Sequence, residues 1–184
     1  MELQTETLGF SGSCYWSMEA IFQTLRGVTS VKQGWLNVSG EPLMVEAVVI
    51  EYIPTVISLE VLVAIHLHTH SCTSEHDLRG RYPSIIYVFD EPQHHRARQA
   101  LAICQADFIQ PIITQVEDGG NFQPSKKSLH AYYYSDPHKP YCENQIMPKL
   151  QLLLARFADH VDDDKRAAIE HAIAESAMVK KTQW

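Results

Sequence analysis

The 184-residue sequence predicts an α+β domain in which helices flank a mixed β-sheet and an extra helix follows at the C-terminus. Apolar runs typical of strands alternate irregularly with segments of helical periodicity. Two expected strands, 29–36 and 43–52, follow each other without a helix between them. Because no repeat or linker divides the chain, we expect one main domain at 1–157 and a helical extension at 158–184.

The N-terminal part of the chain supplies three strands and two helices in this prediction. In order, they are strand 5–10, helix 15–25, strand 29–36, strand 43–52 and helix 59–66. Gly27 ends the first helix and Pro54 follows the third strand. Ser58 can cap the second helix because its side-chain oxygen can accept an unpaired first-turn N–H.

The C-terminal part begins with a polar, turn-rich segment at 71–83. The expected elements that follow are strand 84–90, helix 92–106, strand 110–116, a turn at 118–121, helical turns near 125–133 and 148–157, and helix 162–178. Pro92 suits a first helical turn, and Gly119-Gly120 is typical of a chain reversal. Aspartates at the start of the last helix and lysines at its end complement the helix dipole.

Charge and hydropathy exclude several classes of partner. The chain has 15 Lys and Arg against 22 Asp and Glu, a net charge of −7, so a nucleic-acid partner is not expected. No apolar run approaches the roughly 20 residues that span a bilayer, so a membrane partner is not expected either. The N-terminus lacks a basic segment followed by an apolar run, which predicts a cytoplasmic protein.

The four cysteines are widely spaced and form no CxxC pair, which argues against a structural zinc site or a disulfide scaffold. They are Cys14, Cys72, Cys104 and Cys142. Cys14 lies between a strand and a helix, where the helix dipole favours the thiolate and is expected to lower the thiol pKa. From this feature alone, a buried cysteine that packs as a small apolar residue is an equally good interpretation.

Several segments in a consistent order carry a family resemblance. They are SCYWSMEAIF with RGVTSVKQGW, then MVEAVVIEY, HDLRGRYPSIIY and PYCENQIMPKL. Together they resemble the A-type peptide methionine sulfoxide reductases over roughly residues 5–155. The resemblance implies a ferredoxin-like α/β sandwich or roll. It also implies thiol-dependent reduction of methionine S-sulfoxide, free or in proteins, without a cofactor.

The resemblance places the nucleophile at Cys14, which would attack the sulfoxide sulfur. Glu46 falls on the family's acidic position and would protonate the sulfoxide oxygen. Desolvation would raise the pKa of this carboxyl and keep it protonated, because its neighbours in sequence are apolar. These neighbours are Leu43, Val45, Ala47 and Val48.

Other site residues would position the sulfoxide. Tyr82 would hydrogen-bond the oxygen, although a tyrosine before a strand is more often half-buried core. Asp77 would organise its loop or a water molecule, and an isolated Asp in a turn is usually a turn former. Tyr15 and Trp16 would bind the substrate by forming a slot for its methyl group, a role compatible with ordinary core packing.

Attack by Cys14 leaves methionine and a cysteine sulfenic acid. Cys142 matches the family's C-terminal cysteine and is the expected resolving thiol, in a segment that we expect to be mobile. Cys72 is a second candidate for this role, and Cys104 is expected to be buried and inert. Thioredoxin or a similar dithiol would then reduce the disulfide.

Two features leave other functions open. The family carries a second tyrosine in a longer connection, but no tyrosine occurs between Trp35 and Glu46. The hydroxyl of Tyr15 and Trp35 are the candidates to replace it. If neither does, the alternative function is a catalytically impaired binding module.

A metal site is a further alternative, because period-two spacing would align a set of ligands on one strand face. These ligands are His66, His68, His70 and Cys72.

Overall fold

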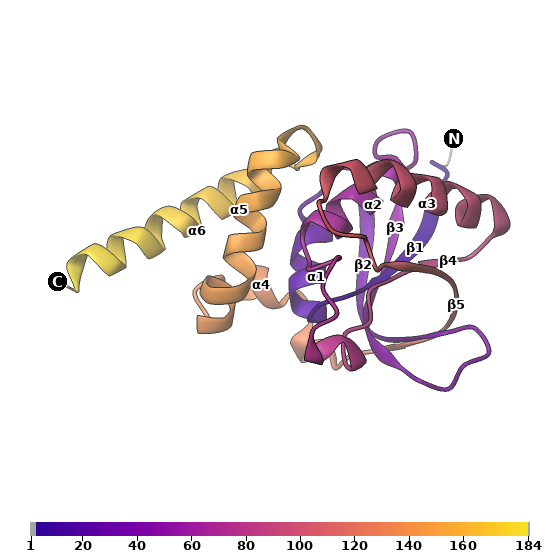
Figure 1. Cartoon of the computed structure of the whole chain (residues 1–184). Helices are drawn as coiled ribbons and strands as arrows, with labels where there is room; N and C mark the ends of the chain where they lie inside the picture. Colours follow the sequence, from indigo (N-terminus) through magenta and orange to yellow (C-terminus); the bar gives the residue numbers. More distant parts are fainter. Residues whose placement is uncertain (1–2, 184) are drawn as a thin grey trace.

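The computed structural model describes residues 3–183 and has the predicted mixed α+β architecture (Figure 1). The strands are β1 (Glu6–Ser11), β2 (Val28–Val38), β3 (Val45–Tyr52), β4 (Ile85–Val88) and β5 (Gln115–Pro124). The helices are α1 (Tyr15–Gln23), α2 (Leu59–His68), α3 (Glu91–Cys104), α4 (Tyr132–Ser135), α5 (Met147–Arg156) and α6 (Asp163–Thr182).

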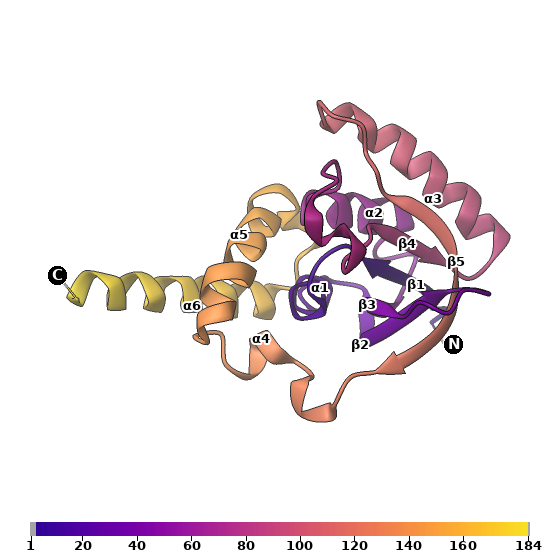
Figure 2. The same ribbon diagram turned by 60° about the horizontal axis from the view of Figure 1, so that its bottom comes forward.

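The five strands form one mixed sheet that closes on itself. Its order is β1-β3-β2-β5-β4, and β4 pairs back to β1. The pairs of β1 with β3, β3 with β2, β2 with β5 and β1 with β4 are antiparallel, whereas β4 and β5 are parallel. Figure 2 shows the strands as a curved sheet with α1, α2 and α3 around it.

Alternation along the strands separates two apolar clusters. One strand face contributes Phe10 and Ile50 to the main core, where they pack with buried residues of α1 and α2. The other face encloses a smaller cluster that includes Leu36, Ala47 and Tyr87. The main core therefore fixes the position of α1 against the sheet, and with it the residue that precedes this helix.

The predicted turn at 118–121 is wrong, because this segment is part of β5. Gly119 pairs with Val38 of β2, and a Cβ on Gly119 would lie 2.5 Å from the ring of Phe89. A Cβ on Gly120 would lie 2.3 Å from the side-chain oxygen of Asn37. These glycines allow a close approach of neighbouring groups within a strand, and they do not reverse the chain.

The C-terminal helix α6 extends away from the sheet (Figure 1). Asp162 caps it by accepting a hydrogen bond from the Lys165 N–H at 3.1 Å. Contacts with the segment before α5 hold the middle of the helix, since the Ser176 hydroxyl donates to Glu143 at 2.7 Å and His138 lies 2.7 Å from Glu175. Within residues 3–183, every helix is too short or too polar to cross a bilayer.

Candidate active site

Cys14 is the residue that precedes α1, and a tight connection from β1 holds it there. β1 ends at Ser11, and Gly12 has a φ of +149°, a backbone conformation that residues other than glycine rarely adopt. A Cβ on Gly12 would also lie 2.7 Å from the ring of His70. The glycine therefore allows the connection to pack against His70 and to present the Cys14 sulfur at the start of the helix.

The environment of the Cys14 sulfur contains opposing influences on its pKa. Burial raises the thiol pKa above its ordinary value, and the nearby Glu46 carboxylate acts in the same direction. Hydrogen bonds from the Tyr141 hydroxyl and the backbone N–H groups of Trp16 and Ser17 act in the opposite direction and are weaker. The predicted lowering of the pKa is therefore wrong, because desolvation exceeds the effect of the helix N-terminus.

Glu46 lies on β3 beside Cys14 and is nearly buried, with 11% of its side chain exposed. The backbone N–H of Tyr15 donates to its Oε1 at 3.4 Å, and the Tyr82 hydroxyl hydrogen-bonds to the same carboxyl group. Arg81 Nε lies 3.5 Å from its Oε2. The structure thus brings together Cys14, Glu46 and Tyr82.

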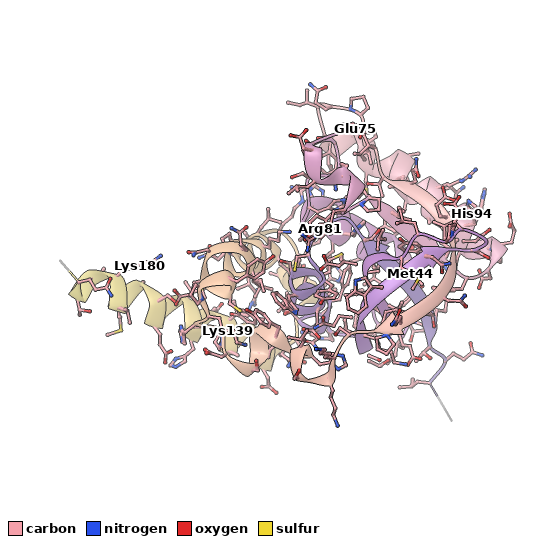
Figure 3. The ribbon with its side chains drawn as sticks, turned by 90° about the horizontal axis from the view of Figure 1, so that it is seen from below. Met44, Glu75, Arg81, His94, Lys139 and Lys180 are labelled. Atoms are coloured by element: carbon pink, nitrogen blue, oxygen red, sulfur yellow. The ribbon has the colours of Figure 1, made fainter. Side chains whose placement is uncertain are left out.

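Arg81 is a residue of this site that the sequence analysis did not identify. Its guanidinium lies 5.2 Å from the centre of the Tyr82 ring, in addition to its contact with Glu46. The side chain is 70% exposed, and Figure 3 shows it near the middle of the face seen from below. The sequence did carry one signal for it. Arg81 directly precedes Tyr82, which was expected in the same site as the Glu46 carboxyl, and a cation is a natural partner for a carboxylate.

Asp77 lies in a short 3-10 turn, Asp77–Gly80, and its side chain is exposed. Within residues 3–183 its carboxylate makes no hydrogen bond or ion pair, and it does not line the cavity beside Cys14. The turn is capped instead by His76 Nδ1, which accepts the Leu78 N–H at 3.2 Å. A role for Asp77 in organising the loop therefore has no contact that supports it.

Arg79 holds in place the loop that Asp77 was expected to organise. Its guanidinium donates to the carbonyl oxygens of Gly12 at 3.0 Å, Tyr82 at 2.8 Å and Ser74 at 2.8 Å, and also to that of Ser71. One side chain therefore fixes the loop against the backbone next to Cys14. The sequence offered no signal for this role, because an arginine that pairs with carbonyl oxygens has no fixed partner residue type.

Aromatic side chains pack beside the start of α1. The Trp16 ring is stacked on Tyr132 at 3.9 Å between centroids, and Tyr141 meets Trp16 edge-on at 5.6 Å. Tyr15 lies 5.9 Å from Trp16 and 5.7 Å from Trp35. Both expected substrate-binding residues thus belong to one aromatic cluster that also contains Trp35.

The four cysteines, all within the described residues, are free thiols. Cys142, in the segment that we expect to be mobile, is fully buried in a π-helical turn, Cys142–Ile146, that continues into α5. Cys72 is 2% exposed and Cys104 is 9% exposed, which confirms the expected burial of Cys104. Burial raises the pKa of Cys142 and of Cys72 to about 11, so both are neutral thiols at pH 7.

Cys14 opens onto a cavity of about 610 Å³ that lies between α1, the end of α2, the Arg79 loop and the start of α5. Tyr82 and Tyr141 line it together with Cys14, whereas Cys142 and Cys72 do not. A small molecule in this cavity can therefore reach the sulfur of Cys14 without contact with either candidate resolving thiol. Most of the other lining residues are polar, and Leu78 adds an apolar side chain.

The histidine run from 66 to 72 does not form the strand that the metal alternative requires. His66 and His68 lie in α2, where residues two apart point in different directions. His66 Nε2 pairs with the Ser11 carbonyl at 2.9 Å, and the His70 ring lies between the His66 carbonyl at 2.5 Å and the Ser84 hydroxyl at 2.6 Å. Residues 3–183 contain no group of three His, Cys, Asp or Glu side chains arranged to hold a metal ion.

Comparison with known proteins gives consistent matches. The sequence model of the family described as "Peptide methionine sulfoxide reductase" matches residues 6–161. A peptide methionine sulfoxide reductase MsrA from Chromobacterium violaceum is 34% identical over 164 residues, which cover 80% of this chain and 93% of that protein.

Solved structures share the fold at lower identity. The reduced form of Mxr1 from Saccharomyces cerevisiae has a TM-score of 0.67 at 17% identity, covering 76% of this chain and 90% of that one. Mxr1 in complex with Trx2 has a TM-score of 0.56 at 16% identity and covers 69% of this chain and 87% of that one. The site geometry and the match over residues 6–161 together show that the chain belongs to the peptide methionine sulfoxide reductase family.

Proposed function

We propose that this chain reduces the S epimer of methionine sulfoxide to methionine, with Cys14 as the nucleophile. The observation that carries the proposal is the convergence of Cys14, Glu46 and Tyr82 at the start of α1, in a chain of this family. The preference for the S epimer follows from the resemblance to A-type enzymes. The substrate is the sulfoxide in proteins or as the free amino acid.

In the proposed first step, the Cys14 thiolate attacks the sulfoxide sulfur. Glu46 donates a proton to the departing oxygen, and the Tyr82 hydroxyl donates a hydrogen bond to it. The oxygen passes to Cys14 as a sulfenic acid, so the sulfoxide is reduced to the thioether while the thiol is oxidised. The aromatic cluster around Trp16 and Tyr15 supplies an apolar surface for the substrate methyl group.

In the proposed second step, a cysteine thiol condenses with the Cys14 sulfenic acid, forming a disulfide and releasing water. We assign this role to Cys142 ahead of Cys72, because Cys142 directly follows Tyr141, whose hydroxyl contacts the Cys14 sulfur. A thioredoxin or similar dithiol then reduces the disulfide. The complex of the structural relative Mxr1 with Trx2 supports this partner.

Three further proposals concern the chain as a whole. We assign the reductase domain to residues 1–157 and an added helical extension to 158–184, supported by the family match that ends at residue 161. The strand order β4-β1-β3-β2 supports a ferredoxin-like arrangement to which β5 is added. The four unpaired thiols support a reducing compartment such as the cytoplasm.

The decisive experiment measures turnover of methionine S-sulfoxide with dithiothreitol as the reductant. Cys14→Ser should abolish turnover, and the matched control Cys104→Ser should retain it, because Cys104 lies outside the site. Activity that survives Cys14→Ser would exclude the mechanism. A wild-type chain that binds the sulfoxide without turning it over would instead favour the impaired binding module.

The resolving step needs a separate measurement with thioredoxin as the reductant. Cys142→Ser should form one equivalent of methionine in a single turnover and then fail to cycle. Cys72→Ser should cycle normally. If Cys142→Ser cycles with thioredoxin at the wild-type rate, the assignment of Cys142 is wrong.

A further inference from the structure

The cavity beside Cys14 is lined without a single acidic side chain, although the whole chain carries a net charge of −7. Its lining residues are Gly12, Ser13, Cys14, Ser17, His68, Thr69, His70, Ser71, His76, Leu78, Tyr82, Tyr141, Gln145 and Lys149. One lysine and several hydroxyl groups face a space large enough for an amino-acid derivative. An acidic protein that keeps carboxylates out of one cavity provides a local preference for anions there.

Lys149 is the one lysine or arginine among the described residues that line the cavity. It lies in the first turns of α5 and is half-buried, and burial lowers the pKa of its ammonium group. Within residues 3–183 it makes no ion pair or hydrogen bond, and it lies within electrostatic range of Cys14. A partly desolvated cation without a counter-ion is unfavourable on its own, and an anionic ligand would compensate for this cost.

The other basic groups nearby are neutral or already engaged. Burial lowers the pKa of His70 to about 3, and it lowers that of His66, behind the cavity, well below its usual range. The Arg79 guanidinium donates to backbone carbonyl oxygens and so has its donors satisfied. His68 Nε2 lies 3.1 Å from Asp107, and His76 Nδ1 accepts the Leu78 N–H. Lys149 therefore remains as the cation that can meet a ligand, and Ser13 and Gln145 line the same cavity.

We propose that this cavity is a subsite for the α-carboxylate of the substrate, with the Lys149 ammonium as its cation. The inference rests on the proposed reductase function and names the preferred substrate class: methionine sulfoxide that is free or at a C-terminus. Four bonds separate the sulfur from the carboxylate carbon in this amino acid. A sulfoxide held at Cys14 therefore directs its carboxylate to a position a short distance away, and an internal residue of a protein has no charge to place there.

The test compares N-acetylmethionine S-sulfoxide with its N-methylamide, using dithiothreitol, which carries no charge. These substrates differ in the carboxylate alone. In the wild type, kcat/KM should favour the carboxylate by about tenfold to a hundredfold, the range of a charge-assisted hydrogen bond, with the difference in KM. Lys149→Met should remove this preference, and Lys149→Arg should restore part of it.

Lys180→Met is the matched control, because it removes the same charge near the far end of α6 (Figure 3) and should keep the wild-type preference. Equal kcat/KM values for the two substrates in the wild type would overturn the subsite while leaving reductase function intact. An equal loss for both substrates in Lys149→Met, with a shifted pH profile, would overturn it in favour of an effect on the Cys14 thiolate.

A final arm replaces dithiothreitol with a carboxylate-bearing monothiol. If Lys149→Met slows turnover with this reductant alone and the substrate preference stays unchanged, the carboxylate belongs to the reductant and the proposed substrate subsite is wrong. If neither substrate is turned over by the wild type, the proposed function itself fails. The two failures are therefore distinguishable.

Discussion

Glu19 offers a sharp test of how the aromatic cluster is held in place. It is 2% exposed on α1, and its carboxylate accepts hydrogen bonds from Gln33 Nε2 at 3.0 Å and from the backbone N–H groups of Ala131 at 2.9 Å and Tyr132 at 3.0 Å. The last two contacts secure the start of α4, and Tyr132 is the residue that stacks on Trp16. Glu19→Met keeps the length of the side chain and removes the acceptor.

The expected cost follows from the groups left without partners. Gln33 retains the Leu129 carbonyl at 2.7 Å, so its loss is small. The two backbone N–H groups lose a charged acceptor, which costs about 1.5–3 kcal/mol each before the relief of carboxylate desolvation is subtracted. We therefore expect a net destabilisation of about 3 kcal/mol.

Urea unfolding followed by tryptophan fluorescence measures this change in the free energy of unfolding. With a slope of about 2 kcal/mol per molar urea, the midpoint should fall by about 1.5 M. Glu41→Met is the control, because Glu41 is exposed and its midpoint should stay close to the wild type. A midpoint shift below about 0.3 M in Glu19→Met, with an unchanged slope, would show that the buried carboxylate does not stabilise this region.

Four further predictions concern the site itself. Tyr141→Phe removes a hydrogen bond that lowers the Cys14 pKa, so the pKa should rise further and iodoacetamide should alkylate Cys14 about three- to tenfold more slowly at pH 8; an unchanged or faster rate would refute this. In the wild type, the alkylation rate should keep increasing to a higher pH than it does for an ordinary cysteine, because burial raises the pKa of the Cys14 thiol, and a plateau below pH 8 would contradict the burial effect. Arg79→Met should release residues 71–82 from the Gly12 carbonyl. Amide hydrogen exchange in this loop should then be faster than in the wild type, while exchange in β3 stays the same. An unchanged rate in the loop would mean that the guanidinium does not hold it. Glu46→Gln should lower kcat by about 10²–10⁴ if it acts as the general acid, and a loss below threefold would exclude this role.

The parts of the site that could be predicted are those that strand and helix periodicity determine. A nearly continuous apolar run placed Glu46 on a buried strand, the start of the first helix placed Cys14 at its N-terminus, and the family resemblance assigned both to one site. Tyr82 joined them because it precedes β4, the strand that pairs with β1. Each of these positions depends on local pattern together with strand order.

Burial could not be predicted in the same way, because it depends on segments far apart in the sequence. The pKa of Cys14 depends on its burial and on its hydrogen bond with Tyr141, which is 127 residues away in the sequence. The glycines of β5 resemble a turn until β2 and Phe89 are placed against them. Arg79 takes the organising role expected of Asp77 because its partners are carbonyl oxygens, which no motif encodes.

The burial of Cys142 has a consequence for the order of events. A disulfide requires the two Cα atoms to lie about 4.4–6.8 Å apart with the sulfurs in contact. Here the Tyr141 hydroxyl hydrogen-bonds the Cys14 sulfur, and the next residue, Cys142, is fully buried in a helical turn. If Cys142 resolves the sulfenic acid, Tyr141 must leave Cys14 and the turn must open first. The π-helical turn lies directly before α5, and its i→i+5 hydrogen bonding differs from that of the α-helix it joins, which favours opening at this turn.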